Sequence, residues 1–221
     1  MSIMKGLKAM DQALTGQRSS GGDSGAAKVR WLKLDDGQSV RIRFVEELDE
    51  DSKGYDESRG LAIVVKEHTN PKDYKRKAVC TMDSEGRDWA EEMHRKDPKA
   101  GWAGRFRFYV NVLVDNGVDD PYIAVFSQGV GKQSAFNTIR EYFLETGSIS
   151  NLTWKLKRSG TGTDTTYVLL PTSPDSEPFD WSGHEAPPLE SAIRQVPYAE
   201  QESFYLGFDG PAASSSSNID W

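Results

Sequence analysis

The sequence predicts a mainly β protein: a five-stranded Greek-key barrel that carries a small inserted subdomain of helices and loops, with flexible termini. Short runs of alternating apolar and polar residues recur along the middle of the chain, only two helical segments interrupt them, and a Gly- and Thr-rich turn joins the last two runs. The strand-like runs are residues 30–34, 40–46, 61–67, 77–82, 105–114, 122–127, 152–158 and 165–170, and the helical segments are 86–96 and 134–146. A helix before the last hairpin of a small sheet is typical of the five-stranded barrel called the OB-fold.

The run at residues 105–114 has two faces of opposite chemistry. Side chains alternate across a strand, so its Phe and Val residues share one face while Arg105, Arg107, Tyr109 and Asn111 share the other. Guanidinium groups beside an aromatic ring suit a surface that holds phosphates and stacks bases. The alternative is a half-buried strand whose outer face is charged only for solubility.

Two further strands repeat this division. Arg41 and Arg43 alternate with apolar residues in one of them, and Lys155 and Lys157 alternate with apolar residues in the other. Trp154 falls on the apolar side and is expected in the core. Three strands therefore offer paired cations on one face, which a merely soluble sheet of mixed charge would not need.

Composition divides the chain into three parts. Residues 1–27 hold an amphipathic segment and a Gly- and Ser-rich linker, residues 28–171 hold the barrel with its insert at about 66–102, and residues 172–221 form an acidic, largely extended tail with one plausible helix at 189–206. The tail carries nine carboxylates against the single cation Arg194, so it accounts for most of the net charge of -7. The acidic balance of the chain therefore does not exclude a polyanionic partner for the barrel.

Other classes of function find little support. One cysteine, Cys80, excludes an internal disulfide, and the lack of a secretory signal or of a bilayer-spanning apolar run predicts a soluble intracellular protein with no membrane partner. The acidic pairs Asp35-Asp36 and Asp119-Asp120 could bind magnesium in a nuclease. Both pairs lie in expected turns, so we expect no enzyme.

Three segments together resemble the single-stranded DNA-binding proteins of tailed bacteriophages, distant relatives of the T-even type helix-destabilising protein. They are Gly101 to Val114, Val125-Phe126-Ser127-Gln128-Gly129 and residues 156–167, and the run Tyr109-Val110-Asn111-Val112-Leu113-Val114 is the most specific. The resemblance covers roughly residues 28–171. It implies an OB-fold that contacts single-stranded DNA, no enzymatic activity, and an acidic tail that recruits replication and recombination proteins. It also implies a role in DNA replication, recombination and repair in the cytoplasm of the infected bacterial host.

The insert departs from the zinc-bearing relatives. Those relatives hold the ion with one His and three Cys, in a subdomain placed before the Tyr-Val-Asn strand. Here residues 66–102 offer His68, Cys80 and His94, and the place of a Cys-x-x-Cys pair reads Asp88-Trp89-Ala90-Glu91. Since a structural zinc site wants four N or S ligands, the sequence predicts no metal and no other cofactor.

The expected DNA contacts follow from the charged faces. Phosphates are expected at Arg41, Arg43, Arg105, Arg107, Lys155, Lys157 and Arg158. Tyr109 is the first choice for stacking a base, with Asn111 beside it. The aromatic residues whose role stays open between stacking and core packing are Trp31, Tyr122, Phe126 and Tyr167.

The two ends of the chain suggest protein contacts. Ile219, Asp220 and Trp221 form a hydrophobic and acidic tip that is expected to bind replication or recombination proteins. The amphipathic segment 3–14 could dock on a neighbouring molecule and support self-association on DNA. Two alternatives stay open: a phage structural or assembly protein that uses the barrel for protein contacts, and an RNA-binding OB-fold protein.

Overall fold

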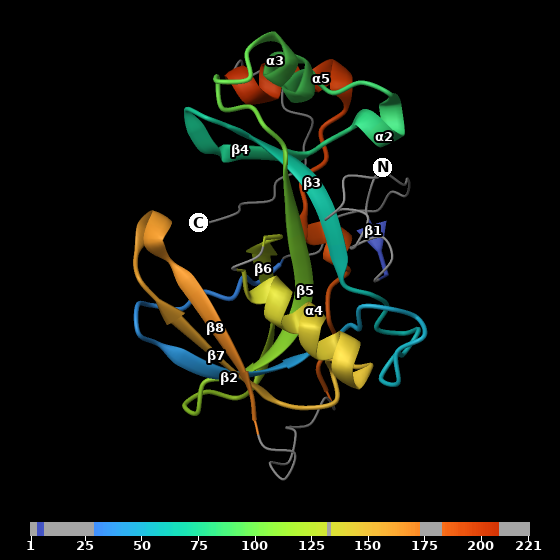
Figure 1. Ribbon diagram of the computed structural model, residues 1–221, viewed down its shortest axis with the longest axis vertical. Coiled ribbons are helices and arrows are strands. Elements are labelled where there is room, and N and C mark those ends of the chain that lie inside the picture. The colour runs from blue at the N-terminus through green and yellow to red at the C-terminus, as the bar shows by residue number, and fades with distance from the viewer. Residues whose placement is uncertain (1–3, 7–28, 132–133, 173–182, 208–221) are drawn as a thin grey trace.

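The structure is a computed structural model that describes residues 4–6, 29–131, 134–172 and 183–207. Eight strands join in one open antiparallel sheet, and a few helices lie against it (Figure 1). The mainly β class predicted from the sequence is confirmed. The tail tip (Ile219, Asp220 and Trp221) and most of the N-terminal part lie outside the described residues. Within the described residues, no helix has the length and apolar character needed to cross a membrane.

The elements follow one another with short connections. The strands are β1 Met4–Lys5, β2 Ser39–Phe44, β3 Ile63–Asn70, β4 Asp73–Val79, β5 Arg105–Asp115, β6 Tyr122–Gly129, β7 Trp154–Ser159 and β8 Thr166–Pro171. The α-helices are α2 Met82–Glu85, α3 Trp89–Lys96, α4 Ala135–Thr146 and α5 Tyr198–Leu206, and the 3-10 helices are η1 Gly162–Asp164 and η2 Leu189–Ala192.

Strand β5 organises the sheet (Figure 1). Two strands share one of its edges: β3 pairs with residues 105–109, and β2 pairs with residues 112–115. β6 pairs along the opposite edge, and the sheet continues from β2 through β7 to β8. Among the described residues no ladder joins β6 to β8, so the sheet stays open there. The rings of Phe126 and Tyr167 meet edge-on across this gap, with centroids 5.9 Å apart.

One face of the sheet, called here the inner face, packs around the main hydrophobic core. The apolar residue of each alternating pair points inward, as the period of two requires, and α4 closes this core with Phe136 and Ile139. Trp154 is fully buried there and donates its ring N–H to the carbonyl of Ile149 at 3.1 Å. The core role expected for Trp154 is confirmed.

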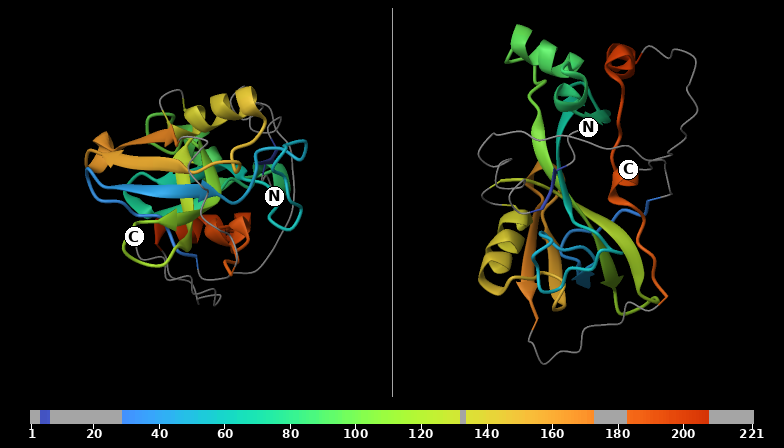
Figure 2. Two further views of the ribbon diagram at one scale, coloured as in Figure 1. Left: turned by 90° about the horizontal axis from the view of Figure 1, so that it is seen from below. Right: turned by 90° about the vertical axis from the view of Figure 1, so that its right-hand side faces the viewer.

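The other face, called the outer face, is covered in part by residues 183–207, which we call the strap (Figure 2). Leu189, Ala192 and Ile193 of the strap pack with Tyr109 and Val125 in a second buried cluster. The backbone of β4 also bonds to the strap, because the N–H of Val79 donates to the carbonyl of Arg194 at 2.9 Å. The expectation of a largely extended tail is therefore wrong for this part of the chain, since its apolar residues gain more by burial than by staying in water.

The chain between β2 and β5 contains the insert, at about residues 66–102, which extends beyond the main core (Figure 1). The β3–β4 hairpin leads into α2 and α3, and α5 of the strap lies beside α3 at the far end. Trp89 and Tyr205 stack with centroids 5.8 Å apart, and Trp102 meets both rings edge-on. The insert thus has its own small core, to which the C-terminal helix contributes.

Candidate nucleic-acid interface

The first half of β5 carries two arginines on the outer face. The Arg105 side chain is exposed and makes no hydrogen bond or ion pair among the described residues. Arg107 is half-buried and donates through Nε to the hydroxyl of Ser127 on β6 at 2.6 Å, with no carboxylate partner in the described part of the chain. Both guanidinium groups therefore keep charge that a polyanion could neutralise.

Tyr109 does not lie on an exposed face, so its predicted role in stacking bases is wrong for this conformation. Its side chain is fully buried, its hydroxyl donates to Glu67, and Nζ of Lys77 donates to that hydroxyl at 3.2 Å. Burial, followed by the negative charge of Glu67, raises the pKa of Tyr109 well above its usual value. The physical reason is the second layer: the strap and Trp31 cover this part of β5, which alternation within a single strand cannot reveal.

Asn111 is also buried, so its predicted contact with DNA is wrong as well. Its side-chain amide donates to Glu46 at 2.6 Å and to the carbonyl of Pro187 in the strap at 2.9 Å, and its backbone N–H donates to the other oxygen of Glu46 at 2.7 Å. Burial raises the pKa of Glu46 to about 8, although the hydrogen bonds from Asn111 oppose that shift. Asn111 therefore serves the fold by joining the sheet to the strap.

Trp31 is the half-buried aromatic residue that remains on the outer face. Its ring meets the ring of Tyr109 edge-on, with centroids 6.1 Å apart, and its backbone forms a bridge with Val125 on β6. The neighbouring backbone groups hold it in place, because the N–H of Leu32 donates to the carbonyl of Val125 at 3.0 Å. Trp31 thus lies on the same face as Arg107 and keeps part of its surface exposed.

The other three aromatic candidates point toward the core side of the sheet. Phe126 is buried in the main core, so of the two roles left open for it, core packing is the one it has in this structure. Tyr122 and Tyr167 are half-buried and pack against that same core. The guanidinium of Arg30 lies 3.2 Å from the centre of the Tyr122 ring, which shields one face of it. Sequence reasoning assigned no role to Arg30, since nothing in the alternation marks this contact.

Strands β2, β7 and β8 form the uncovered part of the outer face. Lys155 and Lys157 are exposed there and make no ion pair among the described residues, and Lys155 is the cross-strand neighbour of Arg41. Arg41 forms an ion pair with Asp115 at 3.1 Å, and Arg43 donates to the carbonyl of Ser150 at 3.1 Å. The exposed cations Lys155 and Lys157 therefore extend the positive surface beyond β5, whereas the Arg43 guanidinium is engaged by the Ser150 carbonyl.

The tip of the β7–β8 hairpin is tied down by the loop before β2. Arg158 donates to the carbonyl of Leu34 and, at 3.3 Å, to the hydroxyl of Thr165. The N–H of Gly160 donates to Asp36 at 2.8 Å, and Gly160 has a φ of 85°, which favours glycine. Arg158 and Asp36 thus fix a turn, and Asp119 likewise accepts a bond from Asn116 within its own turn at 2.9 Å.

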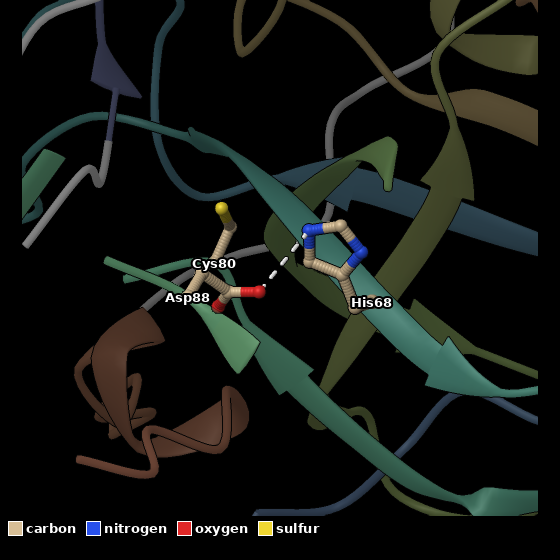
Figure 3. Close-up of side chains that lie close together, drawn as sticks. All are labelled: His68, Cys80 and Asp88. Atoms are coloured by element: carbon tan, nitrogen blue, oxygen red, sulfur yellow. Dashed lines mark ion pairs between the residues drawn. The ribbon is translucent and has the colours of Figure 1, made fainter. Parts of the chain in front are cut away.

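The insert contains a compact group of His68, Cys80 and Asp88, all buried (Figure 3). Their potential ligand atoms lie within 4.8 Å of one another. Nδ1 of His68 lies 2.7 Å from the carbonyl of Trp102, so this nitrogen carries a proton and donates it. Nε2 has no hydrogen bond and faces Glu91 at 3.3 Å and Asp88 at 3.6 Å. His94, the third predicted candidate ligand, is not part of the group.

The comparisons with known proteins add no relative. No protein-family model, no curated protein and no solved structure matches the chain significantly.

Proposed function

We propose that this chain binds single-stranded DNA without strong sequence preference, on the outer face of an OB-fold. Strand pairing supports the fold: β2 pairs with β5, β5 with β6, β2 with β7 and β7 with β8, and a helix precedes the last hairpin. These four pairings are among those that a partly open five-stranded Greek-key barrel requires, and the second and third strands of such a barrel form its oligonucleotide-binding face. In this chain those strands are β5 and β6.

The observation that carries the proposal is the group formed by Arg105, Arg107 and Trp31 on that face. Two guanidinium groups without a carboxylate partner in the described residues lie on the same outer face as the half-buried indole ring, which meets Tyr109, the next residue of that face after Arg107. The nearby carboxylate of Glu67 does not cancel their charge, because Tyr109 and Lys77 already engage it. Cations and a partly exposed aromatic ring on one face are the groups with which proteins hold a single strand.

The binding mechanism follows from these groups. Arg105 and Arg107 neutralise phosphates and release counterions, so affinity falls as salt rises. Trp31 stacks on one base, a contact worth about 1–3 kcal/mol that every base can make. Lys155 and Lys157 extend the cationic surface across β7 and steer the strand toward the site.

The proposal extends to biology. Coating of single-stranded DNA serves phage replication, recombination and repair in the cytoplasm of the infected bacterium, and the tip at Ile219, Asp220 and Trp221 recruits other proteins of those processes. The chain itself has no enzymatic activity and needs no cofactor in this role. Its N-terminal segment supports self-association on the strand.

Fluorescence anisotropy tests the proposal directly. The protein is titrated into a labelled single strand of about 30 bases and into the matching duplex, at low and at moderate salt. We expect tight, salt-sensitive binding to the single strand and weak binding to the duplex. In the double variant Arg105→Gln, Arg107→Gln, the plot of log K against log salt should become shallower, with a slope less negative by about 1.4, because two phosphate contacts are lost.

Two double variants complete the test. Lys96→Gln with Lys99→Gln, exposed at the end of the insert, is the matched control and should leave the slope unchanged. Lys155→Gln with Lys157→Gln should make the salt dependence of binding shallower, but by less than the arginine pair does. Equal binding to single strand and duplex, or an arginine variant that behaves like the control, would refute the proposed function.

A further inference from the structure

We propose that the insert is held together without a metal ion, and that Gln201 of the C-terminal helix α5 closes the buried group that zinc-bearing relatives would close with an ion. This proposal does not depend on DNA binding. The potential metal ligands gathered here are the imidazole of His68, the thiol of Cys80 and the carboxylates of Asp88 and Glu91. A structural zinc site instead uses four N or S ligands.

The protein engages both oxygens of the Asp88 carboxylate. Oδ1 accepts from the N–H of Glu91 at 2.8 Å and so caps helix α3. Oδ2 accepts from the N–H of Thr81 at 3.0 Å and from Nε2 of Gln201 at 3.2 Å. A carboxylate oxygen has about two lone pairs, so Oδ2 has none left for an ion, and an ion could reach Asp88 only through the second lone pair of Oδ1.

Glu91 already has a cation as its partner. Nζ of Lys66 lies 2.7 Å from Oε2 of Glu91, the same oxygen that faces His68. An ion held between Glu91 and His68 would therefore sit against an ammonium group in a poorly solvated site, where like charges repel strongly.

The supply of sulfur ligands opposes a structural zinc site too. Cys80 is the single cysteine of the chain, whereas structural zinc sites use about two to four. The orphaned Nε2 of His68 faces Oε2 of Glu91, which Lys66 already engages, and Oδ1 of Asp88, which accepts from the N–H of Glu91.

Gln201 makes the hydrogen bonds that hold this buried group together in place of metal ligands. It is fully buried, its side-chain oxygen accepts from the N–H of Trp89 at 2.7 Å, and its amide donates to Thr81 at 2.9 Å as well as to Asp88. Beside it, Tyr205 is buried against Trp89 and Trp102. One helix turn of the strap therefore joins both ends of the Thr81–Asp88 loop to the aromatic core of the insert.

The first test measures metal in the full-length protein. We expect purified protein to contain far less than one zinc ion per chain by inductively coupled plasma mass spectrometry. Neither EDTA nor an equimolar addition of zinc should shift its melting temperature. One equivalent of bound metal, a loss of melting temperature with EDTA, or a rise of several degrees on adding zinc to the metal-free protein would overturn the proposal.

The second test addresses Gln201. Gln201→Leu keeps the volume but removes all of its hydrogen bonds, and we expect it to lower the melting temperature by several degrees and to change the fluorescence of Trp89 and Trp102. Glu202→Gln, exposed on the same helix, is the matched control and should do neither. A Gln201→Leu variant as stable as the control would show that α5 does not close the group.

Discussion

Asn111 holds both oxygens of Glu46: its side chain donates to one at 2.6 Å and its backbone N–H to the other at 2.7 Å. The same side chain bonds to Pro187, so one residue in the middle of β5 connects a buried acid, the sheet and the strap. The run that carries the strongest resemblance to DNA-binding proteins thus contains, at this position, a residue that the fold itself requires.

Glu46 should make stability depend on pH. Its pKa is about 8 in the folded protein against 4.5 as a free side chain, so the folded state holds the proton more tightly. This contribution is fully present below about pH 4.5 and is lost as the pH rises through about 8. The free energy of unfolding should therefore fall by a few kcal/mol over that range, relative to a Glu46→Gln variant. Urea unfolding at several pH values measures this, and parallel profiles for the two proteins would contradict it.

Tyr109→Phe should destabilise the protein without weakening DNA binding. The change leaves Glu67 and Lys77 without their hydroxyl partner in a buried site, which should cost about 1–2 kcal/mol. Tyr122→Phe is the control, because the Tyr122 hydroxyl makes no hydrogen bond within the described ranges. Chemical unfolding gives the cost and anisotropy gives the affinity. A loss of affinity with unchanged stability would mean that Tyr109 reaches DNA after all.

Trp31→Leu should weaken binding to single-stranded DNA by about 5- to 150-fold, the equivalent of about 1–3 kcal/mol for one lost stacking contact. Trp31→Phe keeps a π face and should recover much of that loss. Quenching of tryptophan fluorescence by the strand should shrink in both variants. If the Leu variant binds as tightly as the unchanged protein, the indole ring lies outside the interface.

The two parts of the acidic C-terminal region should behave differently on truncation. Removing residues 211–221 should leave the fold intact and the affinity for DNA unchanged or higher, because Asp220, a carboxylate that can compete for the cations, is lost. Removing residues 183–221 should expose Ile63, Val65 and Tyr109 and cause aggregation. Size-exclusion chromatography with anisotropy distinguishes the cases. A soluble, well-folded chain that ends at residue 182 would show that the strap is dispensable.

The sequence predicted the strand periodicity well, because alternation within a strand is a local property. The inward residues of β2, β5 and β7, Trp154 among them, form the main core as expected. Which segment covers the face of a strand is not a local property, because that segment can come from a distant part of the sequence. Tyr109 and Asn111 share a face with Arg105 and Arg107, yet only the first pair is buried, because a segment about 80 residues later crosses that end of the face.

One signal could have revealed the strap. Leu189, Ala192, Ile193 and Val196 recur at helical or near-helical spacing within an acidic region, and Tyr205 follows in a predicted helix. Apolar residues spaced in this way indicate a buried side. The partner of that side could not be read from the sequence, because no pattern within the strap specifies β3 and β5 rather than another strand.

The sharing of one edge of β5 by β3 and β2 also affects how the chain folds during translation. β2 emerges early from the ribosome, but its partners lie about 70 residues later in β5 and about 115 residues later in β7. Its backbone groups must wait unpaired until both have been made, and such long-range pairing is slow and open to aggregation. The insert, whose β3–β4 hairpin is local, can form while β2 waits, although its small core is complete only when Tyr205 arrives. Chaperone demand during translation is therefore expected to fall chiefly on β2.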